Sequence, residues 1–325
     1  MSLPEFKLLR ARTLSEAVEF LGKYEDVQIV AGGTDLIPSM KQRLFTPACV
    51  MDIRRIPELR GMRVIQGKGI EIGALTTLAE IEHSDHIRRE YPVLHEAAKV
   101  VASPILRNMG TLGGNICLDT RCLWYNQSLT WRKSCGFCIK KDGDLCHVAP
   151  GGAKCWAVFS GDTPAALLCL DAELEITGPA GTRRVALRNF YTNVGDARMK
   201  LAKNEVVTRV LLPQRTAGYR GVYRKLRLRG SIDYPLAGVA VALKRSDGDV
   251  EDARLAITAV NPAPLLVKGV EKELVGKPAT EEGAAAVGEL AARTAKPLTT
   301  SALTPEYRRE MIRVFAKRAI IEAAK

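Results

Sequence analysis

Several features that would indicate a membrane, secreted or hydrolytic protein are missing from this sequence of 325 residues. No apolar run approaches the roughly 20 residues that a membrane-spanning helix needs, and the first residues show neither the apolar core nor the cleavage site of a signal peptide. The four histidines form no catalytic set, and nothing marks a hydrolytic triad. We therefore expect a cytoplasmic protein that does not associate with a membrane and whose thiols stay reduced.

Positive charge and cysteine, in contrast, are plentiful. Lysine and arginine number 48 against 36 aspartates and glutamates, which gives a formal net charge of +12. Such an excess suits acidic partners, acidic substrates or nucleic acid, and it equally suits cations spread over a solvated surface. In a reducing compartment the eight cysteines favour a metal site or core packing over disulfides.

Hydrophobic periodicity predicts short strands and amphipathic helices along most of the chain. In the first hundred residues we expect strands at 6–10, 27–30, 49–53 and 69–74, and helices at 13–21, 37–44, 75–81 and 91–101. Strand-like patterns return at 165–170 and 172–177. Beyond residue 218, strands at 238–244 and 254–260 and helices near 280–294 and 304–324 predict a separate α+β C-terminal domain.

Two glycine-rich turns are candidates for holding a phosphate group. The first is Ala31-Gly32-Gly33-Thr34-Asp35, and the second runs from Gly110 to Asn115. Backbone N–H groups can point at an anion where no Cβ blocks its approach, and Thr34, Thr111 and Asn115 could add side-chain donors. Neither turn has the G-x-G-x-x-G pattern of a dinucleotide-binding βαβ unit, so ordinary tight turns remain the alternative.

A cysteine-rich segment follows the second turn. From Asp119 to about Gly161 there is little periodicity, and this stretch holds Cys122, Cys135, Cys138, Cys146 and Cys155. An irregular stretch of this length needs something to fix it in a compact domain, and a metal centre would do so. The residues alone allow an iron–sulfur cluster or a zinc ion with His147 as a possible ligand. Cys49 and Cys169 lie in apolar runs that we expect to be buried strands, and we expect Cys117 to serve packing.

The two turns, with residues 72–77 between them, resemble the FAD-binding subunits of molybdenum hydroxylases, and the resemblance extends through 161–167, 223–225 with Asp233, 307–309 and 317–319. It implies an α+β fold with an N-terminal FAD-binding subdomain at 1–56, a middle FAD-binding subdomain at 57–215 and an α+β C-terminal flavoprotein domain at 216–325. The implied FAD contacts are Ile29, Val30, Ala31, Gly32, Gly33, Thr34, Asp35, Leu36, Val101, Asn108, Gly110, Thr111, Gly113, Gly114, Asn115, Asp162 and Lys225.

The cysteine-rich segment, about 121–160, is an insertion relative to most members of this family. It resembles the insertion of 4-hydroxybenzoyl-CoA reductase β subunits, which implies a [4Fe–4S] cluster on Cys122, Cys138, Cys146 and Cys155. Cys122 and Cys155 lie near the two ends of the insertion, so using both would close it into a compact flap. The chelating spacing of Cys135-x-x-Cys138 leaves Cys135 open as a replacement ligand.

The resemblance also implies a function. The chain would pass electrons from ferredoxin, through [4Fe–4S] and FAD, to a small partner subunit with [2Fe–2S] clusters and a large partner subunit with molybdenum cofactor. That complex, a dimer of heterotrimers, would reductively remove the phenolic hydroxyl of 4-hydroxybenzoyl-CoA, and this chain would carry no catalytic residue of its own. The alternative is the FAD subunit of an oxidising enzyme related to xanthine or carbon monoxide dehydrogenase. A different class of protein, a zinc-stabilised binder of nucleic acid, would be colourless.

Basic residues in the insertion suggest where a donor binds. Arg132, Lys133, Lys140, Lys141 and Lys154 all lie in it. We expect them to form an exposed basic surface that steers an acidic ferredoxin to the cluster.

Overall fold

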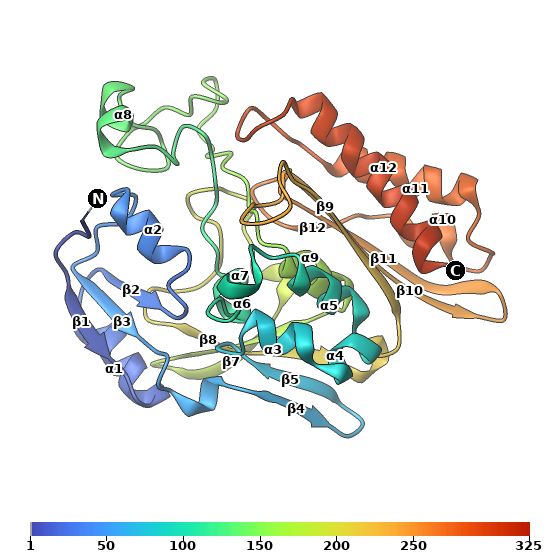
Figure 1. The fold of residues 1–325 in the computed structure, drawn as a ribbon, viewed down its shortest axis with the longest axis horizontal. Coiled ribbons are helices and arrows are strands. Elements are labelled where there is room, and N and C mark those ends of the chain that lie inside the picture. Colours follow the sequence, from blue (N-terminus) through green and yellow to red (C-terminus); the bar gives the residue numbers. More distant parts are fainter. Residues whose placement is uncertain (1) are drawn as a thin grey trace.

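The computed structural model describes residues 2–325 and contains three separate sheets, met in order along the chain (Figure 1). The first is parallel, with the spatial order β1 (Lys7–Arg10), β3 (Cys49–Asp52), β2 (Val27–Val30). The helices α1 (Leu14–Lys23) and α2 (Leu36–Lys41) follow β1 and β2. As its sequence predicts, α1 begins after Thr13, whose hydroxyl accepts a hydrogen bond from the Glu16 N–H.

The second sheet has five antiparallel strands and lies along the lower edge of Figure 1. Its order is β4 (Met62–Ile65), β5 (Gly69–Gly73), β8 (Val206–Pro213), β6 (Glu173–Gly178), β7 (Gly181–Ala186). The chain between β5 and β6 supplies α3 (Leu78–His83), α4 (Asp85–Glu90), α5 (Pro92–Lys99), α6 (Pro104–Arg107), α7 (Leu112–Ile116), α8 (Leu129–Ser134) and α9 (Thr163–Cys169). Except for α8, these helices lie between the second sheet and the third (Figure 1).

The third sheet is antiparallel and is buried on both faces. It has the order β12 (Leu265–Leu266), β11 (Asp249–Thr258), β10 (Ala237–Ser246), β9 (Arg220–Leu226), and the helices α10 (Val270–Leu274), α11 (Glu281–Thr294) and α12 (Pro305–Ala323) follow. Successive side chains of a strand point to opposite faces. On β10, Val239 and Val241 therefore join the core under α11 and α12, while Ala240 and Ala242 join the core shared with α5 and α9.

The insertion folds as a separate lobe beside α2, at the upper left of Figure 1. Its two ends are paired, since Arg121 and Val158 exchange backbone hydrogen bonds of 2.7 and 2.8 Å. A small apolar cluster joins the lobe to Leu44 and Phe45, which follow α2. The insertion is thus closed at its base and packed on the N-terminal region.

Two parts of the fold differ from the sequence prediction. The sequence predicts a strand at 165–170, but residues 165–169 belong to α9, a helix whose seven residues are all buried, and Leu170 follows it as the C-cap. A short, continuously apolar run does not distinguish a buried strand from a buried helix. The strands β4, β7 and β8 and the helix α8 are additional elements. No helix among residues 2–325 is both long and apolar enough to cross a membrane.

Candidate cofactor sites

The two glycine-rich turns are in direct backbone contact. A Cβ on Gly32 would overlap the carbonyl oxygen of Met109, and a Cβ on Gly110 would lie 3.7 Å from Oγ1 of Thr34. Gly33 has φ of +71°, in the left-handed region that favours glycine. The first turn joins β2 to α2, and the second joins α6 to α7. The fold therefore brings together two turns that lie almost eighty residues apart in the sequence.

Adjacent glycines in the second turn face different surroundings. Gly113 is buried, and a Cβ there would come within 2.8 Å of the Cβ of Ala74. Gly114 is exposed, and a Cβ there would meet only Oγ1 of Thr111, at 3.0 Å. Thr111 caps α7 by accepting a hydrogen bond from the Gly114 N–H. Gly113 thus serves packing, while Gly114 leaves the outer side of the turn open.

The other residues predicted to contact FAD surround these turns. Ile29, Val30, Ala31 and Leu36 are all partly exposed along β2 and the start of α2, and Asn108 is exposed. Val101, also partly exposed, accepts a hydrogen bond through its carbonyl from Arg107, which is paired with Glu82. The Oδ1 atom of Asn115 accepts from both the backbone N–H and the hydroxyl of Thr163, which ties the second turn to α9.

Asp162 and Lys225 form a buried ion pair beside the second turn. Lys225 Nζ lies 3.0 Å from Asp162 Oδ2 and donates also to the carbonyl of Val100, and the Tyr223 hydroxyl donates to Asp162 Oδ1 at 2.8 Å. Burial raises the pKa of Asp162 above its ordinary value, and the nearby ammonium opposes that rise. The pair joins α9 to β9 and fixes the backbone at Val100.

A second polar cluster connects all three regions of the chain at the first turn. Asp35 accepts hydrogen bonds from the Tyr234 hydroxyl, at 2.6 Å, and pairs with the guanidinium of Arg121. The same guanidinium lies over the Tyr234 ring, 4.9 Å from its centroid. Arg121 directly precedes Cys122 in the insertion, so the glycine turns and the cysteine-rich lobe are linked by neighbouring residues.

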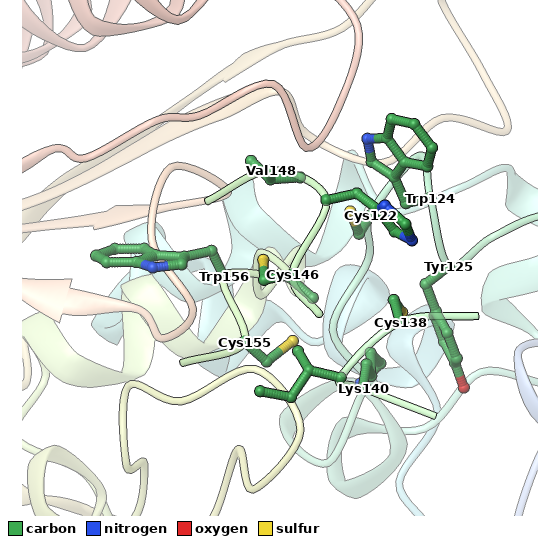
Figure 2. A pocket seen from close by; sticks show the side chains of 12 residues that line it. Cys122, Trp124, Tyr125, Cys138, Lys140, Cys146, Val148, Cys155 and Trp156 are labelled. Atoms are coloured by element: carbon green, nitrogen blue, oxygen red, sulfur yellow. The ribbon is translucent and has the colours of Figure 1, made fainter. Parts of the chain in front are cut away.

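The insertion brings four cysteines to one cavity, as Figure 2 shows. The cavity is lined by Cys122, Cys138, Cys146 and Cys155, together with Trp124, Tyr125, Ile139, Lys140, His147, Val148, Trp156 and Ala157. All eight cysteines of the chain are free thiols. Cys135 ends α8, is partly exposed and does not line the cavity. Cys49 and Cys169 are buried elsewhere, in β3 and α9.

The thiols suit metal binding in their chemistry, although they do not converge on one point. Burial raises the pKa of the Cys122 and Cys155 thiols to about 11, so both stay protonated near pH 7 unless a metal displaces the proton. Within residues 2–325, no three His, Cys, Asp or Glu side chains form a group that could hold a metal ion. His147 stacks on Trp124, and its Nε2 lies 2.5 Å from the carbonyl oxygen of Phe137. This arrangement counts against zinc, which needs its ligands about 2.3 Å from a single ion.

The predicted basic surface of the insertion is wrong in part. Arg132 is buried, with 2% of its surface exposed, and donates to the carbonyl of Arg43. The side chain of Lys140 is also buried, and its ammonium is hydrogen-bonded to Asp119, Thr120 and Gly195, which lie outside the insertion. Lys133 is exposed, Lys141 is partly exposed, and Lys154 lies over the Trp156 ring. One lysine of a local basic run can be buried and donate hydrogen bonds to buried acceptors. The sequence pattern of charges alone does not predict which lysine of the run this will be.

Sequence reasoning missed four residues that organise these sites. Tyr223 and Tyr234 hold Asp162 and Asp35, and Arg121 and Lys140 join the insertion to its surroundings. Tyr223 stands two residues before Lys225 and faces the same side of β9, which is the one local signal that could have identified it. The others depend on contacts between distant segments.

Comparison with known proteins gives matches along the whole chain. Residues 4–215 match the model described as "FAD binding domain in molybdopterin dehydrogenase", and residues 221–323 match the "CO dehydrogenase flavoprotein C-terminal domain". The carbon monoxide dehydrogenase medium chain of Hydrogenophaga pseudoflava is 31% identical over 318 residues, covering 98% of this chain and 96% of that protein. The glyceraldehyde dehydrogenase medium chain of Sulfolobus acidocaldarius is 29% identical, with 99% of each chain covered.

A solved structure gives the same result in three dimensions. Reconstituted CO dehydrogenase from Oligotropha carboxidovorans superposes with a TM-score of 0.83 at 30% identity, covering all of this chain and 99% of the other. The similarity in fold therefore extends along the whole chain.

Proposed function

Because this chain belongs to the FAD-binding medium subunits of the molybdenum hydroxylase family, we propose that it binds FAD along its two contacting glycine turns and carries electrons within a larger oxidoreductase. The contact between Gly32 and Met109 is the observation that supports this placement, because it brings the backbones of the two turns together, so that N–H groups of both could face one phosphate group. Bound FAD would supply the ability to exchange either one or two electrons.

The residues of the chain have distinct parts in this proposal. The exposed outer side of Gly114 and the first turn would receive the pyrophosphate. The buried Asp162–Lys225 pair would hold the second turn and Val100 in place. The cluster of Asp35, Arg121 and Tyr234 would hold the three regions of the chain together beside the first turn.

The proposed complex contains two further subunits. The relatives are medium chains of carbon monoxide and glyceraldehyde dehydrogenases, and we place this chain likewise between a large subunit with molybdenum cofactor and a small subunit with [2Fe–2S] clusters. A dimer of such heterotrimers in the cytoplasm is the assembly that the family resemblance implies. The substrate site would lie on the large subunit.

The named relatives favour an oxidising enzyme. Both are medium chains of dehydrogenases, so the first candidate is an FAD subunit that receives electrons from its partners. The specific activity of a 4-hydroxybenzoyl-CoA reductase rests on the insertion alone.

The cysteine cavity favours the second candidate, the reductive one. Four free thiols line one cavity without converging on one point. A [4Fe–4S] cluster fits that pattern better than a single ion does, because each thiolate binds a different iron. We propose that Cys122, Cys138, Cys146 and Cys155 hold such a cluster. The chain would then pass electrons from ferredoxin toward its partners, for removal of the phenolic hydroxyl of 4-hydroxybenzoyl-CoA.

Purification of the tagged chain with its native partners tests these candidates. The co-purified subunits would be identified by mass spectrometry and should include a molybdenum-cofactor subunit and a [2Fe–2S] subunit. The complex would then be assayed with reduced ferredoxin and 4-hydroxybenzoyl-CoA, and with oxidisable substrates and an artificial acceptor. Benzoyl-CoA formation would establish the reductive candidate, and substrate oxidation alone would establish the oxidising one. A chain isolated without FAD or partners would refute both.

A further inference from the structure

Lys140 is a buried cation at the wall of the cysteine cavity. Its side chain is 5% exposed, and Figure 2 shows it among the cysteines that line the same space. Nζ donates to Asp119 Oδ1 at 3.0 Å, to Thr120 Oγ1 at 2.7 Å and to the Gly195 carbonyl oxygen at 3.0 Å. An ammonium has three N–H donors, so every donor of Lys140 has an acceptor.

The surroundings fix this charge in one place. The Thr120 hydroxyl donates onward to the Gly195 carbonyl, and the Gly195 N–H donates to the carbonyl of Cys155. Gly195 is pressed against the same cysteine, since a Cβ there would lie 2.7 Å from the Cys155 sulfur. The Tyr125 ring covers Nζ from another side, at 4.8 Å from the ring centroid. Solvent therefore screens the charge little.

Lys140 shares its carboxylate partner with a second cation. Asp119 is the carboxylate that Lys140 contacts, and it also pairs with Arg198, whose Nη1 lies 3.3 Å from the same oxygen. Lys140 and the carboxylate of Asp196 act on the Cys155 thiol with opposite sign. Lys140 is the member of this cluster that lines the cavity itself.

We propose that Lys140 is a fixed positive charge that makes the metal site of the four cysteines easier to reduce, an inference that rests on the cluster in the proposed function. A cluster held by four thiolates is anionic, and reduction adds another negative charge. A nearby cation stabilises the reduced state more than the oxidised one, and burial strengthens that interaction. Lys140 acts here through its field and is not a ligand.

A purely structural role for Lys140 makes a different prediction. If the ammonium only braces the lobe, then removing either Lys140 or its partner Asp119 should loosen the site in the same way. If charge is what matters, Lys140→Met and Asp119→Asn should shift the reduction potential in opposite directions. Methionine keeps most of the volume of lysine, and asparagine keeps an oxygen that can accept from the ammonium.

The test is a redox titration of the purified complex, with the cluster followed by electron paramagnetic resonance and the flavin followed by absorbance. Lys140→Met should lower the midpoint potential of the cluster by at least 59 mV, which is tenfold in the one-electron equilibrium. Asp119→Asn should raise it. The flavin potential should stay constant, and Lys141→Met, a neighbouring lysine that does not line the cavity, should change neither potential.

Each outcome decides the inference. An unchanged cluster potential in Lys140→Met, or shifts of the same sign in both variants, would overturn it while leaving the cluster in place. If Lys140→Met fails to retain a cluster, the sign of the Asp119→Asn shift decides. Absence of iron and sulfide from the wild-type complex would overturn the inference together with the proposed cluster, and that result is recognised before any variant is made.

Discussion

Gly113 and Gly114 in the second turn have different surroundings. A substitution at Gly114 can therefore test the FAD site without unfolding the protein. A side chain at Gly113 would strike Ala74 on the neighbouring chain segment, so that substitution tests packing. Gly114 is exposed and has open space beyond the Thr111 hydroxyl. It is therefore the position at which a new side chain meets a bound cofactor first.

We predict that Gly114→Val lowers the FAD content of the folded protein by about tenfold or more, because the branched side chain blocks close backbone approach. FAD would be released by denaturation and quantified by fluorescence, with folding checked by circular dichroism. Gly22→Val is the matched control, since Gly22 is an exposed helical glycine with nothing within 4 Å of its Cβ position. Full FAD occupancy in folded Gly114→Val would refute the placement.

The cysteines offer a second pair of matched substitutions. Cys138 lines the cavity, whereas Cys135, three residues earlier, ends α8 outside it. We predict that Cys138→Ser loses iron and acid-labile sulfide and keeps FAD, and that Cys135→Ser keeps all three. Metal analysis and flavin quantification on anaerobically purified protein measure this. Loss of iron in Cys135→Ser, with retention in Cys122→Ser, would show that the ligand set is wrong.

At the level of elements, α12 is anchored by one arginine. Arg308 is fully buried, and its guanidinium donates to the carbonyls of Leu236, Ala259 and Leu298 at 2.8–2.9 Å. These carbonyls belong to three separate segments around the third sheet. Burial lowers the pKa of Arg308 to about 10, because the charge has left water.

Arg308→Leu should lower the free energy of unfolding by about 3 kcal/mol or more, since each buried carbonyl left without a donor costs about 1–3 kcal/mol. Urea denaturation monitored by circular dichroism would measure the loss. The neighbouring Arg309 is exposed on the same helix, so Arg309→Leu should change stability by about 0.5 kcal/mol or less. Equal effects of the two substitutions would contradict the anchoring role.

Among the helices and strands, some could be predicted from the sequence and others could not. Helices with a strong cap and periodic apolar residues, such as α1 and α12, were predictable because local signals specify them. The run at 165–170 predicts a strand because every residue in it is apolar, whereas Asp162 and Pro164 at the start of α9 are local signals that favour a helix. The meeting of the two glycine turns was suggested by their shared composition, but the contact itself comes from the packing of distant elements.

Over the whole molecule, neighbouring residues connect the two candidate redox sites. Arg121 pairs with Asp35 at the first glycine turn, and the next residue is Cys122 of the cavity. The lobe also packs on Leu44 and Phe45 behind α2. The insertion is therefore attached to the flavin-binding region at its base, and its outer surface remains available to a partner.

Arg132 and Lys140 are buried, so the cations on that outer surface include Lys133 and Lys141. We predict that the double substitution Lys133→Glu and Lys141→Glu slows reduction by ferredoxin about tenfold at low ionic strength, because steering by charge is lost. Stopped-flow absorbance would measure the rate. Lys68→Glu, in the turn between β4 and β5 far from the lobe (Figure 1), is the control.

Reduction by a small uncharged donor should be unaffected in the double variant. If both donors slow equally, or if the wild-type rate with ferredoxin does not depend on salt, these lysines do not form a docking surface.

If one chain carries both FAD and an iron–sulfur cluster, the composition of the purified wild-type protein shows it most directly. Flavin, iron and acid-labile sulfide would be measured per chain after anaerobic purification, alongside the absorption spectrum. We predict iron and sulfide in equal amounts, about four of each per FAD, with a broad shoulder beneath the flavin peaks. FAD accompanied by zinc, or by no metal at all, would contradict it.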